Sequence, residues 1–154
     1  MKTRILGAAL GTAVLSGLLV ASPAQAKDGV SSARVDPFRG HGGGSVRATV
    51  DFVSRTKVRF RNFTVRDICP GDNLPVRARV HWKHTDGTNG RSAWKSDTNG
   101  CGDDGTNFGT ITRTGSKSIS RVYLEVSVLD PGGISQRVYK LSTSRYNQYV
   151  HPGR

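Results

Sequence analysis

The segment Leu74–His84 reads LPVRARVHWKH and alternates between apolar and mostly cationic side chains. A period of two indicates a β-strand that is buried on one face only. The apolar set consists of Leu74, Val76, Ala78, Val80 and Trp82. The opposite set consists of Arg77, Arg79, His81 and Lys83. The segment therefore predicts a strand with a cationic outer face.

Similar alternation recurs on both sides of this segment, between Gly-rich turns. Further strands are predicted at residues 46–52, 57–68, 92–95, 107–113, 118–129 and 134–141. Within 57–68 the phase changes near Arg61 and Asn62, which indicates a bulge or a change of sheet. Helix-forming Ala and Glu are sparse in the exported part, whereas turn-forming Asp, Gly, Ser, Thr and Asn are common. The sequence thus predicts an all-β domain, a single antiparallel β-sandwich of about seven strands with one disulfide.

Residues 1–26 have the pattern of a secretory signal peptide. Lys2 and Arg4 precede an apolar run over residues 5–20, and a small-x-small cleavage site ends at Ala26. The run is too short to span a membrane comfortably, and no later segment could do so. We therefore expect a secreted protein without a transmembrane segment.

The exported chain divides into an arm and a domain. Residues 27–45 lack clear alternation and end in a Gly-rich run, a composition typical of flexible linkers. We expect residues 27–45 to be a flexible arm without a fold of its own. Residues 46–154 are expected to form the β-sandwich domain.

Cys69 and Cys101 are the only two cysteines, and both follow the expected cleavage site. An even number in an oxidising compartment predicts one disulfide. Closing a loop of about 32 residues should stabilise the fold by roughly 3–4 kcal/mol. If 57–68, 74–84 and 92–95 form an up-down-up meander, both cysteines lie at the same end of the sheet.

The exported chain is strongly basic. Without Lys2 and Arg4, 21 of the 23 Lys and Arg residues remain against 11 Asp and Glu residues, a formal charge of +10. Such a charge concerns partners and solubility rather than fold. It favours an anionic polymer as partner, either nucleic acid, wall teichoic acid or acidic polysaccharide. The alternative, a basic protein that is merely soluble, stays open at this point.

The candidate binding residues are the cationic side chains of two predicted strands. They are Arg59, Arg61, Arg77, Arg79, His81 and Lys83. If the two strands pair, their cations could merge into one anion-binding face, although like charges directly opposite each other cost stability. The alternative is a solvated outer face. No aromatic side chain for stacking bases is expected on this face, because Trp82 has inward parity.

Catalytic and metal sites have weaker support. A hydrolase site could be built only around His81, His84, Asp86 and Glu125. Glu125 and His151 supply the residue types of a nuclease acid–base pair, but their spacing does not support one. His81 and His84 differ in parity, which weakens them as zinc ligands. The Asp- and Gly-rich loop 96–105 lacks the bidentate ligand of an EF-hand.

These observations favour a secreted, non-enzymatic binding protein without a cofactor or metal. One alternative is a secreted protein inhibitor that acts through the disulfide-braced loop 96–105. A second alternative is a small secreted hydrolase such as a nuclease.

A looser pattern spans roughly residues 60 to 135. It comprises Thr64–Asp67, a turn at Gly71–Asp72, the alternating Val and Arg strand, Thr85–Thr88, Trp94 and a Gly-rich loop before the last hairpin. This pattern resembles small secreted actinobacterial proteins of uncharacterised function. The resemblance implies a secreted β-sandwich and assigns no catalytic residue.

Overall fold

The computed structural model describes residues 27–38, 41–70, 75–102, 104–129 and 137–151. Over these ranges the chain is all-β, and every pairing between named strands is antiparallel. Residues 1–26, the expected signal peptide, lie outside the described residues. The described ranges hold no helix long and apolar enough to cross a membrane.

The first sheet is built on β3 (Lys57–Ile68). One side of β3 pairs with β2 (Gly43–Phe52), which in turn pairs with β1 (Gly29–Val35) at the edge of the sheet. The other side of β3 pairs with two short strands, β7 (Thr106–Asn107) and β8 (Ile111–Thr114).

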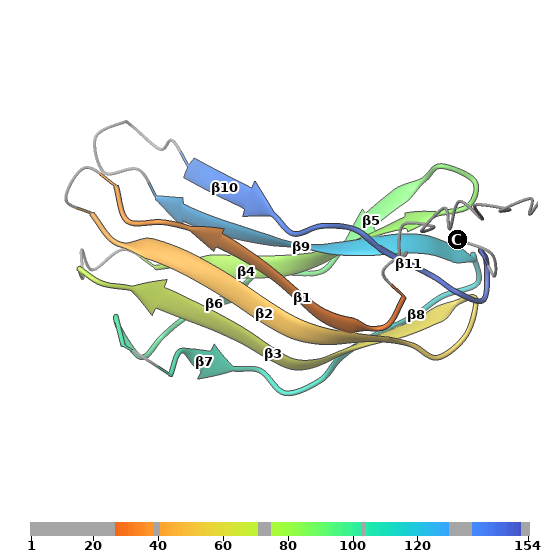
Figure 1. The fold of residues 1–154 in the computed structure, drawn as a ribbon, viewed down its shortest axis with the longest axis horizontal. Helices are drawn as coiled ribbons and strands as arrows, with labels where there is room; N and C mark the ends of the chain where they lie inside the picture. Colours follow the sequence, from red (N-terminus) through yellow and green to blue (C-terminus); the bar gives the residue numbers. More distant parts are fainter. Residues whose placement is uncertain (1–26, 39–40, 71–74, 103, 130–136, 152–154) are drawn as a thin grey trace, which may run out of the picture.

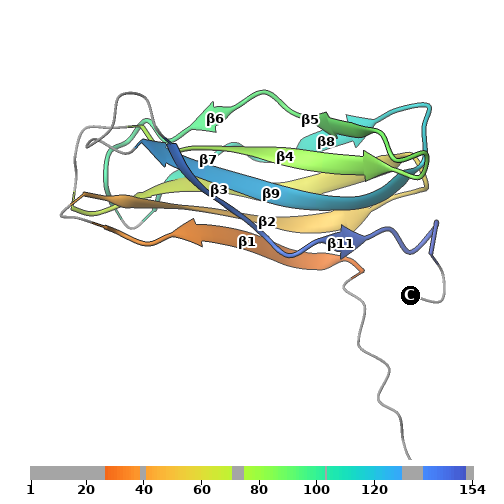
Figure 2. The ribbon, with the colours of Figure 1, turned by 90° about the horizontal axis from the view of Figure 1, so that it is seen from above.

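The second sheet is built on β4 (Arg77–His84) and β9 (Ile119–Leu129). Beyond β4 lie β5 (Asn89–Arg91) and β6 (Lys95–Ser96). Beyond β9 lie β10 (Arg137–Leu141) and β11 (Arg145–Tyr146). Both sheets run along the long axis of the molecule (Figure 1). Figure 2 shows β1 and β11 along one side, and β5, β6 and β8 along the opposite side.

One hydrophobic core joins the two sheets, since inward side chains of β2 and β3 belong to the same cluster as those of β4 and β9. The largest fully buried side chains include Phe52, Phe60, Phe63, Ile119 and Leu124. On β4 the predicted inward set is confirmed where it is described, because Val76, Ala78, Val80 and Trp82 are all buried. The alternate residues of each strand must therefore lie on the outer faces of the sheets.

The phase change predicted in residues 57–68 is a bulge in β3. The register between β2 and β3 shifts between Arg47 and Thr49. Opposite this shift, Asn62 has a φ of 52°, a left-handed conformation that Asn tolerates better than most residues. The extra residue moves the alternation by one, so Phe60 before it and Phe63 after it both face the core.

The structure corrects the expectation of a flexible arm at residues 27–45. Residues 29–35 are β1, and β2 begins at Gly43. Ser31, Ala33 and Val35 are buried. A Cβ at Gly44 would lie 2.5 Å from a side-chain carbon of Val76. The glycines here allow close packing of chain segments, which their composition alone cannot distinguish from a linker.

The strand pairing also differs from the expected meander. β3 and β4 lie in different sheets, so the predicted strands 57–68 and 74–84 do not pair. Eleven strands are assigned within the described residues, where the sequence predicted about seven. The difference arises in three places. Two short strands, β5 and β6, flank residues 92–94 where one strand was predicted at 92–95, and β7 and β8 replace the single strand predicted at 107–113. In addition, β1 and β11 were not predicted.

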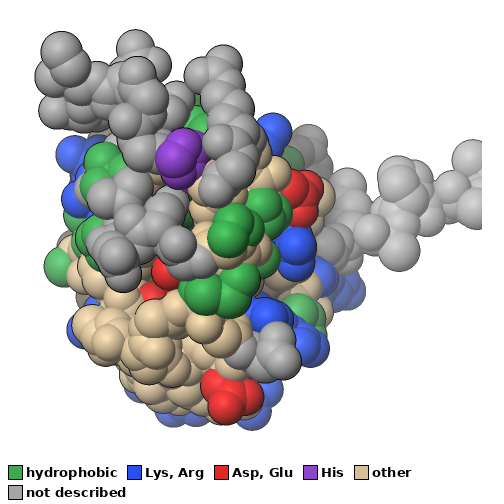
Figure 3. Space-filling model, turned by 90° about the vertical axis from the view of Figure 1, so that its left-hand side faces the viewer, with side chains coloured by type: hydrophobic (Ala, Val, Ile, Leu, Met, Phe, Trp, Pro, Cys, Tyr) green, Lys and Arg blue, Asp and Glu red, His purple; other side chains and the backbone are tan. Residues whose placement is uncertain are grey.

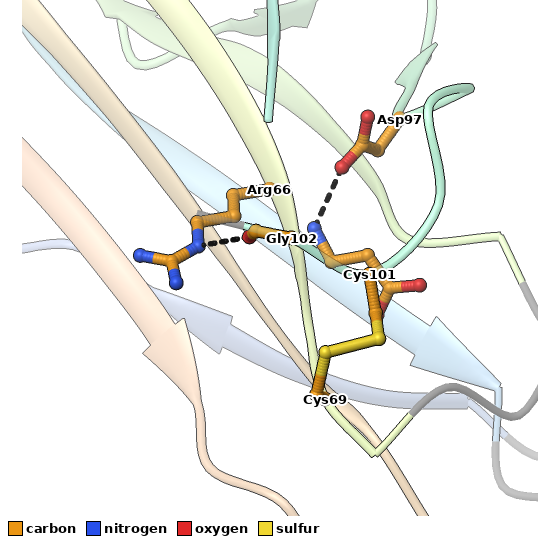
Figure 4. The surroundings of a disulfide bond; sticks show 6 residues. Arg66, Cys69, Asp97, Cys101 and Gly102 are labelled. Carbon is orange, nitrogen blue, oxygen red and sulfur yellow. Dashed lines mark hydrogen bonds between the residues drawn. A yellow bond between two sulfur atoms is a disulfide. The ribbon is translucent and has the colours of Figure 1, made fainter. Parts of the chain in front are cut away.

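The disulfide between Cys69 and Cys101 is confirmed, with Cα atoms 5.2 Å apart. It does not arise from a meander. The chain before β7 runs alongside the end of β3, where Asp67 and Cys101 form an isolated bridge. Beside the disulfide, Nε of Arg66 donates a hydrogen bond to the carbonyl oxygen of Gly102 at 2.7 Å (Figure 4). The disulfide therefore fixes the loop before β7 against β3.

Candidate functional site

The predicted cationic strand lies on the outer face of the second sheet, and we call this surface the β4–β9 face. It is formed by the outward residues of β4 and by the β9 residues directly opposite them. These are Arg77, Arg79, His81 and Lys83 on β4, and Ser127, Glu125, Tyr123 and Arg121 on β9. Side chains directly opposite each other on one face are close enough to interact.

Glu125, the only glutamate in the chain, lies at the centre of this face. Its Oε2 accepts a hydrogen bond from Nε of Arg79 at 2.6 Å and lies 2.5 Å from Nε2 of His81. The side chains of Glu125, Arg79 and His81 are only 11%, 14% and 14% exposed. Arg79 and His81 are therefore held inside the protein's own network and offer little free charge.

The network also sets the protonation of its members. Burial raises the pKa of Glu125, but hydrogen bonds from Arg79 and His81 outweigh it, so the pKa of Glu125 lies below its usual value. Burial lowers the pKa of His81 below its usual value of 6.5, against the raising effect of Glu125. Arg79 and Arg91 lower it further. At neutral pH His81 is therefore neutral, and its Nε2–H donates to the carboxylate.

Aromatic rings lie on this network, contrary to the expectation that the face would have none. The ring of Tyr123 stacks on His81, with centroids 4.8 Å apart and planes at 10°. The ring of Trp94, which lies between β5 and β6, is 4.4 Å from the guanidinium carbon of Arg77 and 4.0 Å from that of Arg79. Such cation–π contacts hold the two guanidinium groups in place.

Three other cations on or beside this face have no acidic partner in the described part of the chain. Lys83 lies directly opposite Arg121, and Arg91 of β5 lies directly opposite His81. None of these three cations forms an ion pair there. The guanidinium carbon of Arg121 instead lies 6.0 Å from the ring centre of Tyr146. We call these residues the Lys83–Arg91–Arg121 cluster; their mutual repulsion would be relieved by an external anion.

The surroundings of the cluster and the opposite edge of the face are exposed. An open pocket of about 250 Å³ is lined by His81, Asn89, Gly90 and Arg91. At the opposite edge, Tyr139 and Leu141 of β10 lie opposite Ser127 and Glu125, and are 60% and 51% exposed. The face thus offers cations at one edge and apolar surface at the other.

The other two predicted binding residues lie elsewhere. Arg59 and Arg61 are exposed on β3, in the first sheet. Nε of Arg61 lies 3.9 Å from a carboxylate oxygen of Asp51. Because β3 and β4 belong to different sheets, the two cationic sets do not merge into one face.

Positive charge is not confined to the β4–β9 face. Figure 3 views the end of the molecule at which β3 ends and shows Lys and Arg side chains around its rim, with acidic and hydrophobic side chains between them. The β4–β9 face combines cations without an acidic partner in the described chain with the rings of Trp94 and Tyr123.

The loop that suggested calcium binding uses its acidic side chain for folding. Asp97 is buried, and its two oxygens accept hydrogen bonds from the hydroxyl of Thr106 at 2.5 Å and from the backbone N–H of Asp67 at 2.7 Å. In the described residues, no group of three or more His, Cys, Asp or Glu side chains could hold a metal ion. The carboxylate of Asp97 thus anchors the loop to β3.

The other residues named as catalytic candidates lie apart from Glu125. His84 is buried on the inner face of β4, where Nδ1 lies 3.3 Å from the carbonyl oxygen of Ser118. His151 lies 3.3 Å from the hydroxyl of Ser120. The ammonium of Lys117 lies 2.8 Å from Asp86 and, by hydrogen bonding, holds the pKa of that carboxyl well below its usual range.

The residues of the candidate site that the sequence did not single out are Arg91 of β5, Arg121 of β9 and Trp94, which lies between β5 and β6. The outward parity of Tyr123 and Glu125 is visible in the sequence. For Arg91, the signal in the sequence is the hairpin turn at residues 85–88, which places Arg91 opposite His81. Comparisons of the chain with protein-family models, with curated proteins and with solved structures found no match.

Proposed function

We propose that the protein is a secreted, non-enzymatic binding protein that holds an anionic polymer on its β4–β9 face. The observation that carries this proposal is the Lys83–Arg91–Arg121 cluster, in which cations on three neighbouring strands have no acidic partner in the described chain. Neighbouring strands are about 4.8 Å apart, so one anionic chain crossing the sheet would meet these cations in succession. Each anion that is neutralised releases counterions, which favours binding at low salt.

The network around Glu125 fixes the surface next to the Lys83–Arg91–Arg121 cluster. Because Arg79 and His81 are fixed by Glu125, and Tyr123 is stacked on His81, the surface beside the cluster is held in one arrangement. A fixed aromatic ring next to cations provides a surface for a base or a sugar ring. The polymer classes that fit are nucleic acid, a phosphate-rich cell-wall polymer and an acidic polysaccharide.

The proposed setting is the cell exterior, with residues 1–26 as the export signal. The apolar run after Lys2 and Arg4 supports export, and a disulfide is typical of an oxidising compartment. We also infer that the two sheets form one β-sandwich, because side chains from both contribute to one core.

The proposal is tested by salt-gradient elution of residues 27–154 from immobilised heparin, RNA and a teichoic acid. A variant with Lys83, Arg91 and Arg121 all replaced by Gln should elute at lower salt. Its salt slope should be smaller by roughly 2 to 3, since each phosphate contact contributes about 0.7 to 0.9.

The matched control replaces Arg47, Arg59 and Arg61, three exposed cations of the first sheet, by Gln. This control carries the same change in net charge and should retain most of the affinity. Equal loss in both variants would show that affinity follows net charge and would contradict the proposal. Retention that does not change with salt would favour a packed protein interface, as in an inhibitor.

One observation favours a nuclease as a second candidate function. Glu125, His81 and Arg79 come together as a carboxylate, an imidazole and a guanidinium, the residue types of ribonuclease chemistry. In the structure the carboxylate and the imidazole hydrogen-bond each other directly, and both are largely buried, so neither faces a space for a substrate hydroxyl. Cleavage of RNA or DNA that is lost in Glu125→Gln would establish this second function.

A further inference from the structure

A separate pocket opens between β5 of the second sheet and β8 of the first, which lie on the same side of the molecule (Figure 2). Its volume is about 390 Å³, within the range of about 300–1,000 Å³ typical of small-molecule sites. The side chains that matter for its chemistry are Trp82, Arg113, Ser116 and Lys117. They come from β4 of the second sheet, from β8 of the first sheet and from the turn that follows β8.

Arg113 is a cation that faces the space between the sheets. It lies directly opposite Val58, which is fully buried, so both side chains lie on the inner face of the first sheet. Its guanidinium carbon lies 4.7 Å from the ring centre of Trp82. Its Nε is buried without a hydrogen-bond partner, and no carboxylate pairs with it in the described ranges. A guanidinium fixed on an aromatic ring without a counter-charge is preorganised for an oxyanion.

The remaining side chains that matter add a second cation and a hydroxyl. Lys117 lies at the rim, where its ammonium is 2.8 Å from Asp86 and both side chains are about half exposed. An exposed ion pair of this kind contributes little to stability, so Lys117 is free to turn towards a bound anion. Ser116 supplies a hydroxyl that can hydrogen-bond the hydroxyl groups of a ligand.

We propose that this pocket binds a small hydroxylated ligand that carries an oxyanion, with a sugar phosphate or a sugar acid as the chemical class. Arg113 binds the oxyanion, Lys117 closes on it from the rim, and the indole of Trp82 forms the apolar wall. The pocket shares Asn89 and Gly90 of β5 with the pocket beside His81, but Trp82 and Arg113 lie on inner faces, so the position of the oxyanion is distinct from the Lys83–Arg91–Arg121 cluster. The inference therefore stands independently of the proposed polymer binding.

The test is isothermal titration calorimetry of residues 27–154 with three probes: glucose 6-phosphate, glucuronate and glucose. We expect at least one anionic sugar to bind and neutral glucose not to bind; the tighter of the two anionic probes identifies the oxyanion. Arg113→Gln should weaken binding by about tenfold to a hundredfold, the effect of losing a hydrogen bond to a charged group. The matched control Arg59→Gln, an exposed cation on the outer face of the first sheet, should bind like the wild type.

Three results would overturn the proposal: no binding of either anionic sugar, glucose binding as tightly as the anionic sugars, or equal affinity in Arg113→Gln and the wild type. If Arg113→Gln does not fold, Trp82 provides a second measurement. In a Trp94→Phe background Trp82 is the only tryptophan. Saturating glucose 6-phosphate or glucuronate should then change its emission and protect it from acrylamide, and an unchanged signal with both would also overturn the proposal.

Discussion

Replacing Glu125 with Gln perturbs the centre of the β4–β9 face while keeping the shape of the side chain. The carboxylate makes two short contacts, 2.6 Å to Arg79 and 2.5 Å to His81, and Arg79 is only 14% exposed. Hydrogen bonds to charged groups contribute about 1.5–3 kcal/mol each. Because an amide still accepts one of them and solvent reaches the edge of the network, we expect the free energy of unfolding to fall by about 2–3 kcal/mol.

A loss of this size should lower the Tm by roughly 6–12 °C for a domain of this length, which circular dichroism can measure. The same variant should bind polyanions more tightly, because removing the carboxylate frees the charge of Arg79. The salt slope on heparin should increase by up to about one. Lower stability together with higher affinity is the expected signature, since general damage to the fold would lower both.

The matched control is Asp104→Asn, which makes the same change in net charge at an exposed side chain without an ion pair in the described chain. Its Tm should stay unchanged, and its retention should change less than that of Glu125→Gln. An unchanged Tm in Glu125→Gln, or weaker retention on heparin, would refute the reasoning.

Three further predictions concern stability. Replacing Cys69 and Cys101 together by Ala should lower the free energy of unfolding by about 2–5 kcal/mol, and equal thermal melts of variant and wild type would argue against a structural role for the disulfide. Removing residues 27–35 deletes β1 with its buried Ala33 and Val35, so the truncated chain should lose cooperative unfolding; a truncated chain as stable as the full one would contradict the described fold. Finally, the pKa values of His81 and Glu125 are both lowered in the folded state, so the unfolded chain binds protons more readily and stability should fall as the pH drops below about 6.5. Urea midpoints between neutral and acidic pH measure this, and His81→Gln should flatten the upper part of the dependence; a midpoint independent of pH would be inconsistent with both shifts.

The strands with a regular alternation could be predicted from the sequence, whereas their pairing could not. The inward residues of β4 and β9 were identified because a strand buried on one face must alternate. That period identifies the buried face of a strand but not its neighbour in the sheet. For this reason the sequence suggested that β3 pairs with β4, whereas the two strands lie in different sheets. β1 was missed because Ser31 occupies a buried position where the pattern calls for an apolar residue.

The candidate site, too, could be predicted from the sequence only in part. The outward positions of Arg77, Arg79, His81 and Lys83 follow from parity alone. The partner of Arg79 does not, because Glu125 is 46 residues away and meets it only when β4 pairs with β9. The charge of Arg79 is therefore paired, although the sequence placed it among the binding residues, whereas Lys83, Arg91 and Arg121 lack acidic partners in the described chain.

The most direct test of the β4–β9 face is a titration of ¹⁵N-labelled residues 27–154 with a heparin oligosaccharide or a short RNA, followed by amide chemical shifts. We expect the largest shifts at Lys83, Arg91, Arg121 and Tyr123, together with the indole N–H of Trp94, and little change on β2 and β3. Addition of salt should reverse these shifts. Shifts centred on the outer face of the first sheet or on loop 96–105, or spread evenly over all basic residues, would contradict the account.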